Sequence, residues 1–242
     1  ARIERTVDLL RENALRGFAT QEAILAAIAH NAAGRAPEEL RNDAGFHRLL
    51  ADLAGSGAPL ISGVLVTDGD FRIVSASWEF PARPADLSDR DYVLMLANPD
   101  AGHALGEPVA GRPMGWPVIP VARRVPALPG QERARGIVIS SFSPDALEAF
   151  YASVAAAPHD VIALFREDGA VLARHPATQD EAEPSLRPRI ATMLDALVTS
   201  GPGAAWVVSV LDGRRRFTVA RRLGEWPAVI AYGVDRAALG AA

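Results

Sequence analysis

Apolar residues near the start of the chain recur in alternating steps of four and three. The series runs through Ile3, Val7, Leu10, Ala14, Gly17, Gln21, Ile24 and Ile28, and only Gly17 and Gln21 interrupt it. This period of 3.5 residues is that of an a/d seam and predicts one long helix over residues 1 to about 33. The seam can pack along its own domain, pair with a second chain, or do both.

A second helix is predicted after the break at Asn31–Gly34. Pro37 suits the first position of a helix, and Gly55-Ser56-Gly57 ends the pattern. The apolar stripe of this helix consists of Phe46, Leu49, Leu50 and Leu53.

Short apolar runs follow, which indicate strands. Asp68-Gly69 lies between runs near 60–67 and 71–77, and this pair predicts a hairpin with a type I′ turn. A proline-broken loop leads to a helix expected at about 89–97, with capping-box spacing from Ser88 to Asp91. Further expected elements are strands near 104–110, 116–125 and 135–142, a turn at Pro126–Gly130, and a connecting helix at 144–155.

The second half of the chain repeats this pattern. Asp68-Gly69 returns as Asp168-Gly169, Val121–Val125 as Val219–Leu223, and Gly136–Phe142 as Ala228–Val234, at offsets of 100, 98 and 92. Three collinear matches favour two copies of one β-rich module. The second copy should contain a helix at 184–199 and strands near 160–166, 170–174, 204–211, 215–223 and 227–234. About five antiparallel strands with helices at one side make each copy an α+β module.

Composition narrows the function classes. The apolar fraction of 49% and charged fraction of 22% are ordinary for a globular protein, and the net charge of −4 gives no case for a nucleic-acid partner. The chain has no Cys, and its five His show no metal-ligand spacing, so we expect no metal and no cofactor. The motifs of nucleophile elbows, phosphate loops and dinucleotide folds are missing, which leaves an enzyme without positive support.

The sequence contains no apolar run of the roughly 20 residues needed to span a bilayer. It opens without Met, inside a helical pattern. We therefore expect it to be part of a longer protein, whose membrane segments could flank it.

Six segments occur in an order that is specific as a set: Asp89-Arg90-Asp91-Tyr92, Gly106–Arg112, Trp116–Arg124, Gly136–Ile139, Ser143–Leu147 and Phe165–Pro176. With the long helix and the two PAS-like modules, these segments resemble the double Cache (PDC) sensor domain. The resemblance implies N-terminal helices at 1–57, a membrane-distal module with the ligand pocket at 58–157, and a membrane-proximal module at 158–242. It also implies a periplasmic sensor of an inner-membrane histidine kinase, diguanylate cyclase or chemoreceptor.

The same resemblance points to a ligand site in the first module. Arg90 and Tyr92 match the positions that hold a ligand carboxylate, and such a guanidinium can form a bidentate pair. Members that bind amino acids carry an acidic residue where Ser141 stands, and a Tyr and an Asp near Val109 and Gly111. With that pattern half present, the expected ligand is a carboxylate or another small polar molecule.

Each candidate residue also has a structural interpretation. Trp78 and Trp116 can line the pocket or anchor loops, and Arg112 can reach the pocket mouth or belong to a solvated turn. Arg90 can instead pair with Asp86, Asp89 or Asp91. The repeated pairs Arg123-Arg124 and Arg221-Arg222 favour a structural role.

Three functions are compared on this basis. The first is a ligand-binding sensor that forms a weak homodimer through the N-terminal helix. The second is a structural dimerisation module with a vestigial pocket, and the third is an enzyme on a PAS-like scaffold. In the sensor interpretation, the second module should be the emptier one, because it lacks the arginine-bearing loop.

Overall fold

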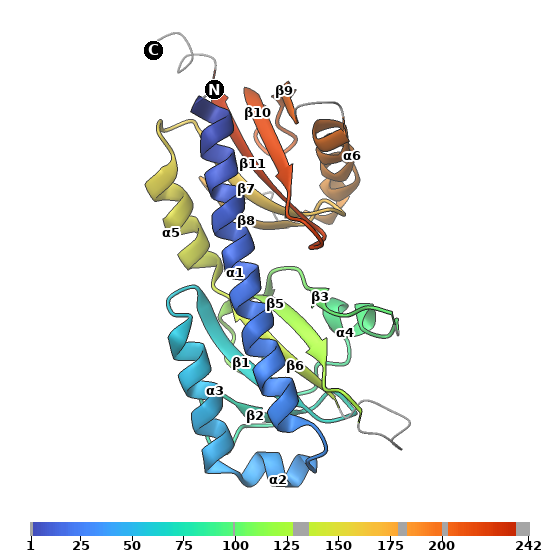
Figure 1. Ribbon diagram of the computed structural model, residues 1–242. Coiled ribbons are helices and arrows are strands. Elements are labelled where there is room, and N and C mark those ends of the chain that lie inside the picture. The colour runs from blue at the N-terminus through green and yellow to red at the C-terminus, as the bar shows by residue number, and fades with distance from the viewer. Residues whose placement is uncertain (1, 99, 128–135, 179–182, 200–202, 236–242) are drawn as a thin grey trace. The chain divides into compact units, whose positions relative to one another are not determined.

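A computed structural model describes residues 2–98, 100–127, 136–178, 183–199 and 203–235 (Figure 1). The chain divides into two compact units. One is Phe18–Ser143, and the other combines the residues up to Gly17 with those from Pro144 onward. The connecting helix that we placed in the first module therefore belongs to the unit of the second sheet.

Helix α1 (Arg2–Ala32) confirms the long helix. The large apolar side chains of its seam are at most 4% exposed: Val7, Leu10, Ile24 and Ile28. Ile3 and Ala14 are half-buried, whereas Leu9, outside the seam, is 72% exposed. The seam thus packs within its own chain and does not leave the apolar surface that we expected for a partner helix.

The predicted second helix is in fact two helices, α2 (Pro37–Asn42) and α3 (Ala44–Ser56). Asp43 separates them, because its carboxylate accepts hydrogen bonds from the backbone N–H groups of Gly45 (2.7 Å) and Phe46 (3.0 Å). This is the role of a helix N-cap, which satisfies backbone donors that have no partner inside the helix. Arg35 holds the same carboxylate at 2.7 Å.

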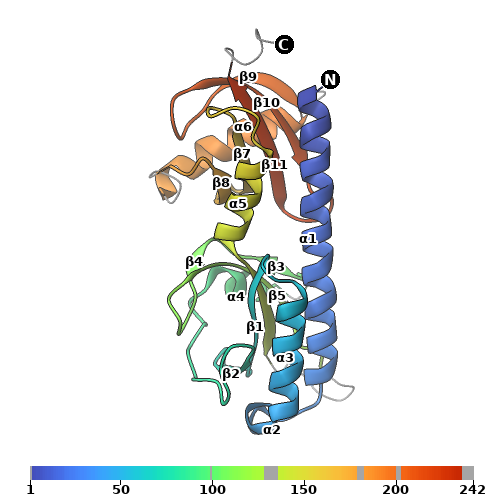
Figure 2. The same cartoon turned by 90° about the vertical axis from the view of Figure 1, so that its left-hand side faces the viewer.

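The unit Phe18–Ser143 contains an antiparallel sheet of order β2-β1-β6-β5-β3, with β4 paired to β5. Its strands are β1 (Ile61–Thr67), β2 (Ile73–Ala76), β3 (Ala104–Leu105), β4 (Val109–Ala110), β5 (Pro117–Arg124) and β6 (Ile137–Phe142). Helices α1 and α3 cover one face of this sheet, and the loop with α4 (Asp91–Met95) covers the other (Figures 1 and 2). The strand expected at 104–110 is broken at Gly106–Pro108, and part of the turn expected at Pro126–Gly130 lies outside the described residues.

Helix α4 is shorter than predicted and starts later. Its N-cap is Arg90, which makes no side-chain capping bond. The capping box at Ser88 is therefore wrong. The backbone N–H of Ser88 instead bonds to the carboxylate of Asp86 at 2.9 Å, within the preceding loop.

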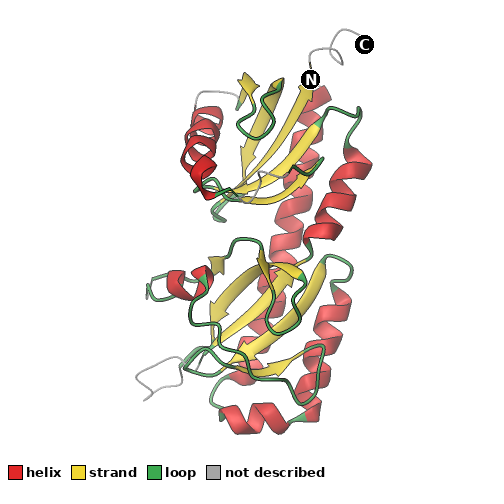
Figure 3. Ribbon diagram, turned by 180° about the vertical axis from the view of Figure 1, so that it is seen from behind, coloured by secondary structure: helices red, strands yellow, loops and turns green. Residues whose placement is uncertain are grey.

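The other unit contains a second antiparallel sheet, of order β8-β7-β11-β10-β9 (Figure 3). Its elements are α5 (Pro144–Val154), β7 (Val161–Arg166), β8 (Val171–His175), the short 3₁₀ helix η1 (Pro184–Leu186), α6 (Arg187–Thr199), β9 (Ala204–Val208), β10 (Arg215–Arg222) and β11 (Ala228–Asp235). Helix α5 packs on β8, and α6 packs on β9 and β10. The prediction of two separate PAS-like sheets is confirmed.

The two sheets match in register, residue by residue. In the first, Val64 pairs with Ser140, which pairs with Val121. In the second, Ile162 pairs with Tyr232, which pairs with Val219. These rows are related by the offsets of 98 and 92 found in the sequence. Even the irregularity between Val66 and Thr67 recurs 98 positions later, between Leu164 and Phe165.

The hairpin turn differs from the prediction. The positive φ belongs to Phe71 (61°) and not to Gly69, so the turn is not type I′. The N–H of Phe71 bonds to the carbonyl of Asp68, and the N–H of Gly169 (φ 90°) bonds to that of Arg166. Phe71 is therefore the structural counterpart of Gly169, again 98 positions apart. The two Asp-Gly pairs lie in equivalent turns, but Asp168-Gly169 occupies positions two residues later in its turn than Asp68-Gly69 does.

The repeated arginine pairs have the structural role that repetition favoured. Arg123 reaches Glu22 of α1 at 2.7 Å, and Arg221 reaches Asp8 of α1 at 2.9 Å. In each unit, the first arginine of the pair thus ties its sheet to the local part of α1.

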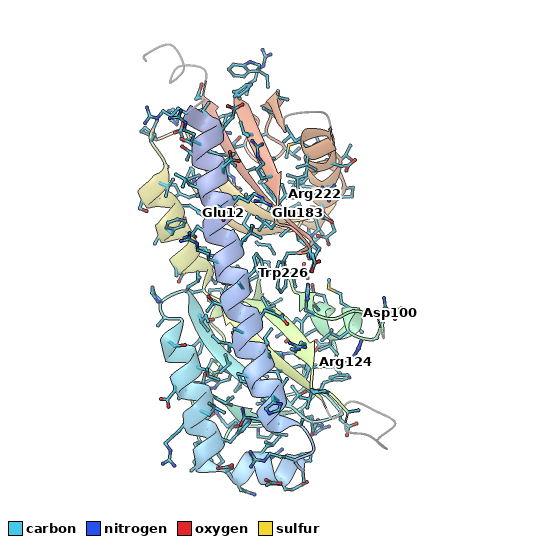
Figure 4. All side chains as sticks on the ribbon, in the orientation of Figure 1. Glu12, Asp100, Arg124, Glu183, Arg222 and Trp226 are labelled. Atoms are coloured by element: carbon cyan, nitrogen blue, oxygen red, sulfur yellow. The ribbon has the colours of Figure 1, made fainter. Side chains whose placement is uncertain are left out.

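The second arginine of each pair contacts residues of its own unit. Arg124 donates to the carbonyl of Asn98, and Arg222 pairs with Glu167 and Asp195 (Figure 4 labels Arg124 and Arg222).

Within the described part of the chain, none of the helices is both long enough and apolar enough to cross a membrane.

The turn assignment makes a testable distinction between Gly169 and Gly69. A Cβ at Gly169 would lie 2.1 Å from the carbonyl oxygen of Arg187, at a φ that L-residues rarely adopt. Gly169→Ala should therefore lower the free energy of unfolding by about 2 kcal/mol or more. Gly69→Ala meets no atom within 4 Å and should change it by less than about 0.5 kcal/mol. Urea denaturation measures both, and equal losses would contradict the assignment.

Candidate functional site

A cavity lies between the sheet of the unit Phe18–Ser143 and the loop that carries α4. All six residues predicted for the site line it: Trp78, Arg90, Tyr92, Arg112, Trp116 and Ser141. These side chains come from separate segments, which the sheet and the α4 loop bring together. The sequence missed the apolar part of the lining, chiefly Leu65, Leu87, Met114, Val118 and Ile139.

Glycines make room for the aromatic side chains of the cavity. A Cβ on Gly63 would lie 3.0 Å from the Trp78 ring, and one on Gly106 would lie 2.8 Å from Cδ1 of Tyr92. Tyr92 is 4% exposed, and burial raises the pKa of its phenol well above the ordinary value. Among the described residues its hydroxyl makes no hydrogen bond, so a polar group is held at the wall of a mostly apolar cavity.

The two arginines of the cavity have different partners. Arg112 forms a bidentate pair with the Asp89 carboxylate at 2.7 and 2.9 Å and also bonds to the carbonyl of Asp86 at 2.8 Å. The hydrogen bond from Arg112 lowers the pKa of Asp89. The structural interpretation of Arg112 is therefore supported, because its guanidinium joins the α4 loop to the turn before β5.

Arg90 is not held by a carboxylate. Its Nη2 donates to the carbonyl of Ala110 at 2.9 Å, and no acidic side chain of the described residues lies within ion-pair distance. The alternative pairing with Asp86, Asp89 or Asp91 is thus not formed. Arg90 remains a cation at the cavity wall, and most of its donors can bind a ligand.

The two tryptophans lie edge to face, with ring centroids 6.3 Å apart and an interplanar angle of 78°. Trp78 packs against the core under the α4 loop, whereas Trp116 is 41% exposed. Trp78 is therefore a wall of the cavity and Trp116 a part of its mouth. Ser141, on the central strand β6, is 8% exposed and forms part of the floor.

The free space inside this cavity is about 30 Å³, which is room for about two water molecules. Of the described residues that line it, none is acidic. A ligand larger than a few atoms would need the mouth to open at Trp116 and Met114.

The second sheet has a cavity as well, so the expectation that less ligand binds in the second module stays a prediction. This cavity lies between the sheet and α6 and encloses about 50 Å³. Two arginines line it, Arg174 and Arg216, which are 3% and 4% exposed. The sequence missed them because they lie on strands β8 and β10 and not on a loop.

Asp212 holds both buried arginines. Its carboxylate accepts from Arg174 Nη2 at 2.8 Å and from Arg216 Nη1 and Nη2 at 2.9 Å each. Burial alone would raise the pKa of Asp212. Hydrogen bonds from Arg216 and from the backbone N–H of Arg214 outweigh this effect and hold the pKa well below its usual range.

Among the described residues no cluster of His, Asp and Glu could hold a metal ion. No family profile and no curated protein sequence matches this chain.

Solved structures do match it. The extracellular domain of rpHK1S-Z16, described as a histidine kinase, has a TM-score of 0.79 at 23% identity, over 99% of this chain and 95% of that one. The ligand-binding domain of chemoreceptor PctB from Pseudomonas aeruginosa PAO1, in complex with L-Gln, has a TM-score of 0.69 at 17% identity, over 99% and 92%. The sensory domain of chemoreceptor Tlp3 from Campylobacter jejuni, with isoleucine bound, has a TM-score of 0.63 at 12% identity, over 99% and 93%.

This chain therefore has the double Cache sensor fold, with a long N-terminal helix and two PAS-like antiparallel sheets. The sequence resemblance is confirmed at the level of the fold. The proteins it is similar to are sensor or ligand-binding domains and not catalytic ones.

The Asp212 cluster predicts a pH-dependent contribution to stability. Asp212→Asn should lower the free energy of unfolding by about 3 kcal/mol at pH 7, because it leaves two buried guanidiniums without their carboxylate. The folded pKa lies below the unfolded value of about 3.9, so this contribution is present above pH 4 and is lost as the pH falls further. Urea denaturation of both proteins at pH 7, 5 and 3 should show the difference shrinking only below about pH 4. A constant difference would contradict the assignment.

Proposed function

We propose that this chain is the extracytoplasmic sensor domain of a transmembrane signalling protein, such as a histidine kinase, a diguanylate cyclase or a chemoreceptor. Its small-molecule ligand would bind in the first module, which would be the membrane-distal one. One observation carries the proposal: Arg90, which has no carboxylate partner in the described part of the chain, lines a cavity together with Tyr92 and two tryptophans. The fold shared with extracellular ligand-binding domains supports it.

The lining favours a carboxylate without an α-amino group. Arg90 can bind a carboxylate through charge-assisted hydrogen bonds, and the Tyr92 hydroxyl adds a donor. An ammonium group would need an acidic partner, because a buried charge is costly without one. Within the described ranges, no acidic side chain lines this cavity.

Ligand binding would have to enlarge the cavity, since its free space is only about 30 Å³. The mouth is the part that can change at least cost, because Trp116 is already 41% exposed. A ligand would thus shift the Gly111–Trp116 turn and, through the Arg112–Asp89 pair, the α4 loop. We infer that this loop movement starts the signal.

The small free space also favours a second candidate function, a structural module with a vestigial pocket. The two functions differ in whether any small molecule shifts the cavity residues. The binding experiment below decides between them.

The first prediction for the site concerns ligand class. A thermal-shift screen should compare each amino acid with its analogue that lacks the α-amino group: L-isoleucine with 3-methylpentanoate, L-serine with 3-hydroxypropanoate, and L-glutamine with 4-carbamoylbutanoate. The analogues should bind in preference to the amino acids. Arg90→Ala should weaken binding of the best analogue by about 2–5 kcal/mol, as for a truncated buried charge pair.

Arg83→Ala is the matched control for this variant. Arg83 is another loop arginine, paired with Glu79 and 63% exposed, and it does not line the cavity. Calorimetry should find that Arg83→Ala binds the best analogue with the same affinity as the wild type. Equal affinities in wild type and Arg90→Ala would refute the site, and no binding by any compound of the screen would favour the vestigial pocket.

We further propose a weak homodimer through α1, now centred on Leu9 because the seam itself is buried. Leu9→Glu should raise the dissociation constant at least about tenfold, since burying a leucine contributes about 1.5–3 kcal/mol. Leu94→Glu, at a leucine of α4 that is 64% exposed, is the control. Sedimentation equilibrium of the three proteins measures the effect, and a strictly monomeric wild type at high concentration would refute the dimer.

A further inference from the structure

The cavity under α6 occupies the same place in its module as the cavity under α4 does in the other. Six lining residues on the strands of the first cavity correspond, through the matched registers, to six lining residues of the second. The pairs are Gly63 and Val161, Leu65 and Ala163, Val118 and Arg216, Pro120 and Thr218, Ile139 and Ala231, and Ser141 and Gly233.

The exchanges between the two copies redistribute the space in the second cavity and add a cation to it. Side chains become smaller at three positions, where Leu65, Ile139 and Ser141 correspond to Ala163, Ala231 and Gly233, whereas Gly63 corresponds to the larger Val161. The free space of the second cavity is about 50 Å³, against about 30 Å³ in the first. At the position of Val118, Arg216 brings a guanidinium into the sheet floor.

The apolar part of the second cavity comes from the sheet and from α6. Phe165 and Val207 contribute from β7 and β9, and Ile190 and Met193 contribute from α6, which lies over this face of the sheet (Figure 3). This wall suits an aliphatic group, because it offers mainly hydrocarbon surface.

Arg216 provides donors at the polar end. A guanidinium has five N–H groups, and Arg216 uses three of them, for the carbonyl of His159 (2.8 Å) and for Asp212. Two N–H groups are left without an acceptor among the described residues, on a side chain that is 5% exposed. Buried donors without an acceptor are costly, and an acceptor on a bound molecule would remove that cost.

We propose that the cavity under α6 is a second ligand site, which takes a small aliphatic carboxylate with its carboxylate at Arg216 and its hydrocarbon part against α6. Phe165, Met193 and Val207 would contact the aliphatic part, and Thr218 lies beside Arg216 at the polar end. This site differs from the proposed sensor site in the other module, and its existence does not depend on that proposal.

The three methionines allow both sites to be tested at once. Met193 lines the cavity under α6, Met114 lines the cavity under α4, and Met95 lines neither. With the methionine methyl groups labelled with ¹³C, 3-methylbutanoate should shift the Met193 signal saturably and leave Met95 unchanged. The cation 3-methylbutylamine, which has the same hydrocarbon part, should not shift Met193.

Two variants return the residue of the first copy to the second. Ala231→Ile restores the residue of Ile139, and Ala163→Leu restores that of Leu65, so each fills the cavity with a side chain that this fold already accommodates. Each should weaken the Met193 response to 3-methylbutanoate at least about tenfold, as expected when a ligand loses apolar contacts in a pocket. Either variant suffices if the other fails to fold.

Arg90→Ala separates the two proposals. It should leave the Met193 response unchanged, whatever it does to Met114. A Met193 signal that does not respond to 3-methylbutanoate, that responds equally to the amine, or that responds equally in a folded Ala231→Ile or Ala163→Leu protein would overturn the second site. A lost Met114 response with an intact Met193 response would concern the sensor site alone.

Discussion

The antiparallel register among the central strands of each sheet is the constraint on which the rest of the structure depends. Successive residues of a strand point to opposite faces, so a slip by one residue would exchange the helix-facing and cavity-facing sets. The row Val64–Ser140–Val121 and its counterpart Ile162–Tyr232–Val219 fix this alternation in the two sheets. Both cavities follow from that register, because their floors use the residues on either side of these rows.

The chain contains no lysine, so arginine provides its long basic side chains. The partners of each arginine distinguish a structural role from a ligand-binding one. Arg123 and Arg221 tie the sheets to α1 through acidic partners, and Arg112 joins two loops through Asp89. Each of these arginines has a carboxylate partner, and the bidentate Arg112–Asp89 pair also fixes the orientation of both side chains. Arg90 differs, because among the described residues its side chain bonds only to the backbone carbonyl of Ala110. A cation left in this state at a cavity wall is what a ligand-binding arginine requires.

The two copies show how duplication allows one architecture to diverge. The strand registers and the turn before the second strand are retained, whereas the side chains at the cavity floor are exchanged. In the first copy, aromatic rings and a loop arginine form the cavity. In the second, smaller floor residues leave space and the charge comes from the strands. The fold thus sets where each cavity lies, and a few side chains set what each can accept.

Sequence patterns predicted the long helix, the duplication and most of the strands, because periodicity and motif order are local properties. The six candidate site residues came from the resemblance to a known sensor family, and the fold gathers them at one cavity. The sequence could not place the break at Asp43, the start of α4 at Asp91, or the positive φ at Phe71, since those depend on which donor meets which acceptor. The folded chain also shows that Arg112 pairs with Asp89 whereas Arg90 does not. It also revealed the cavity at Arg174 and Arg216, because strand residues far apart in sequence become neighbours only when the sheet forms.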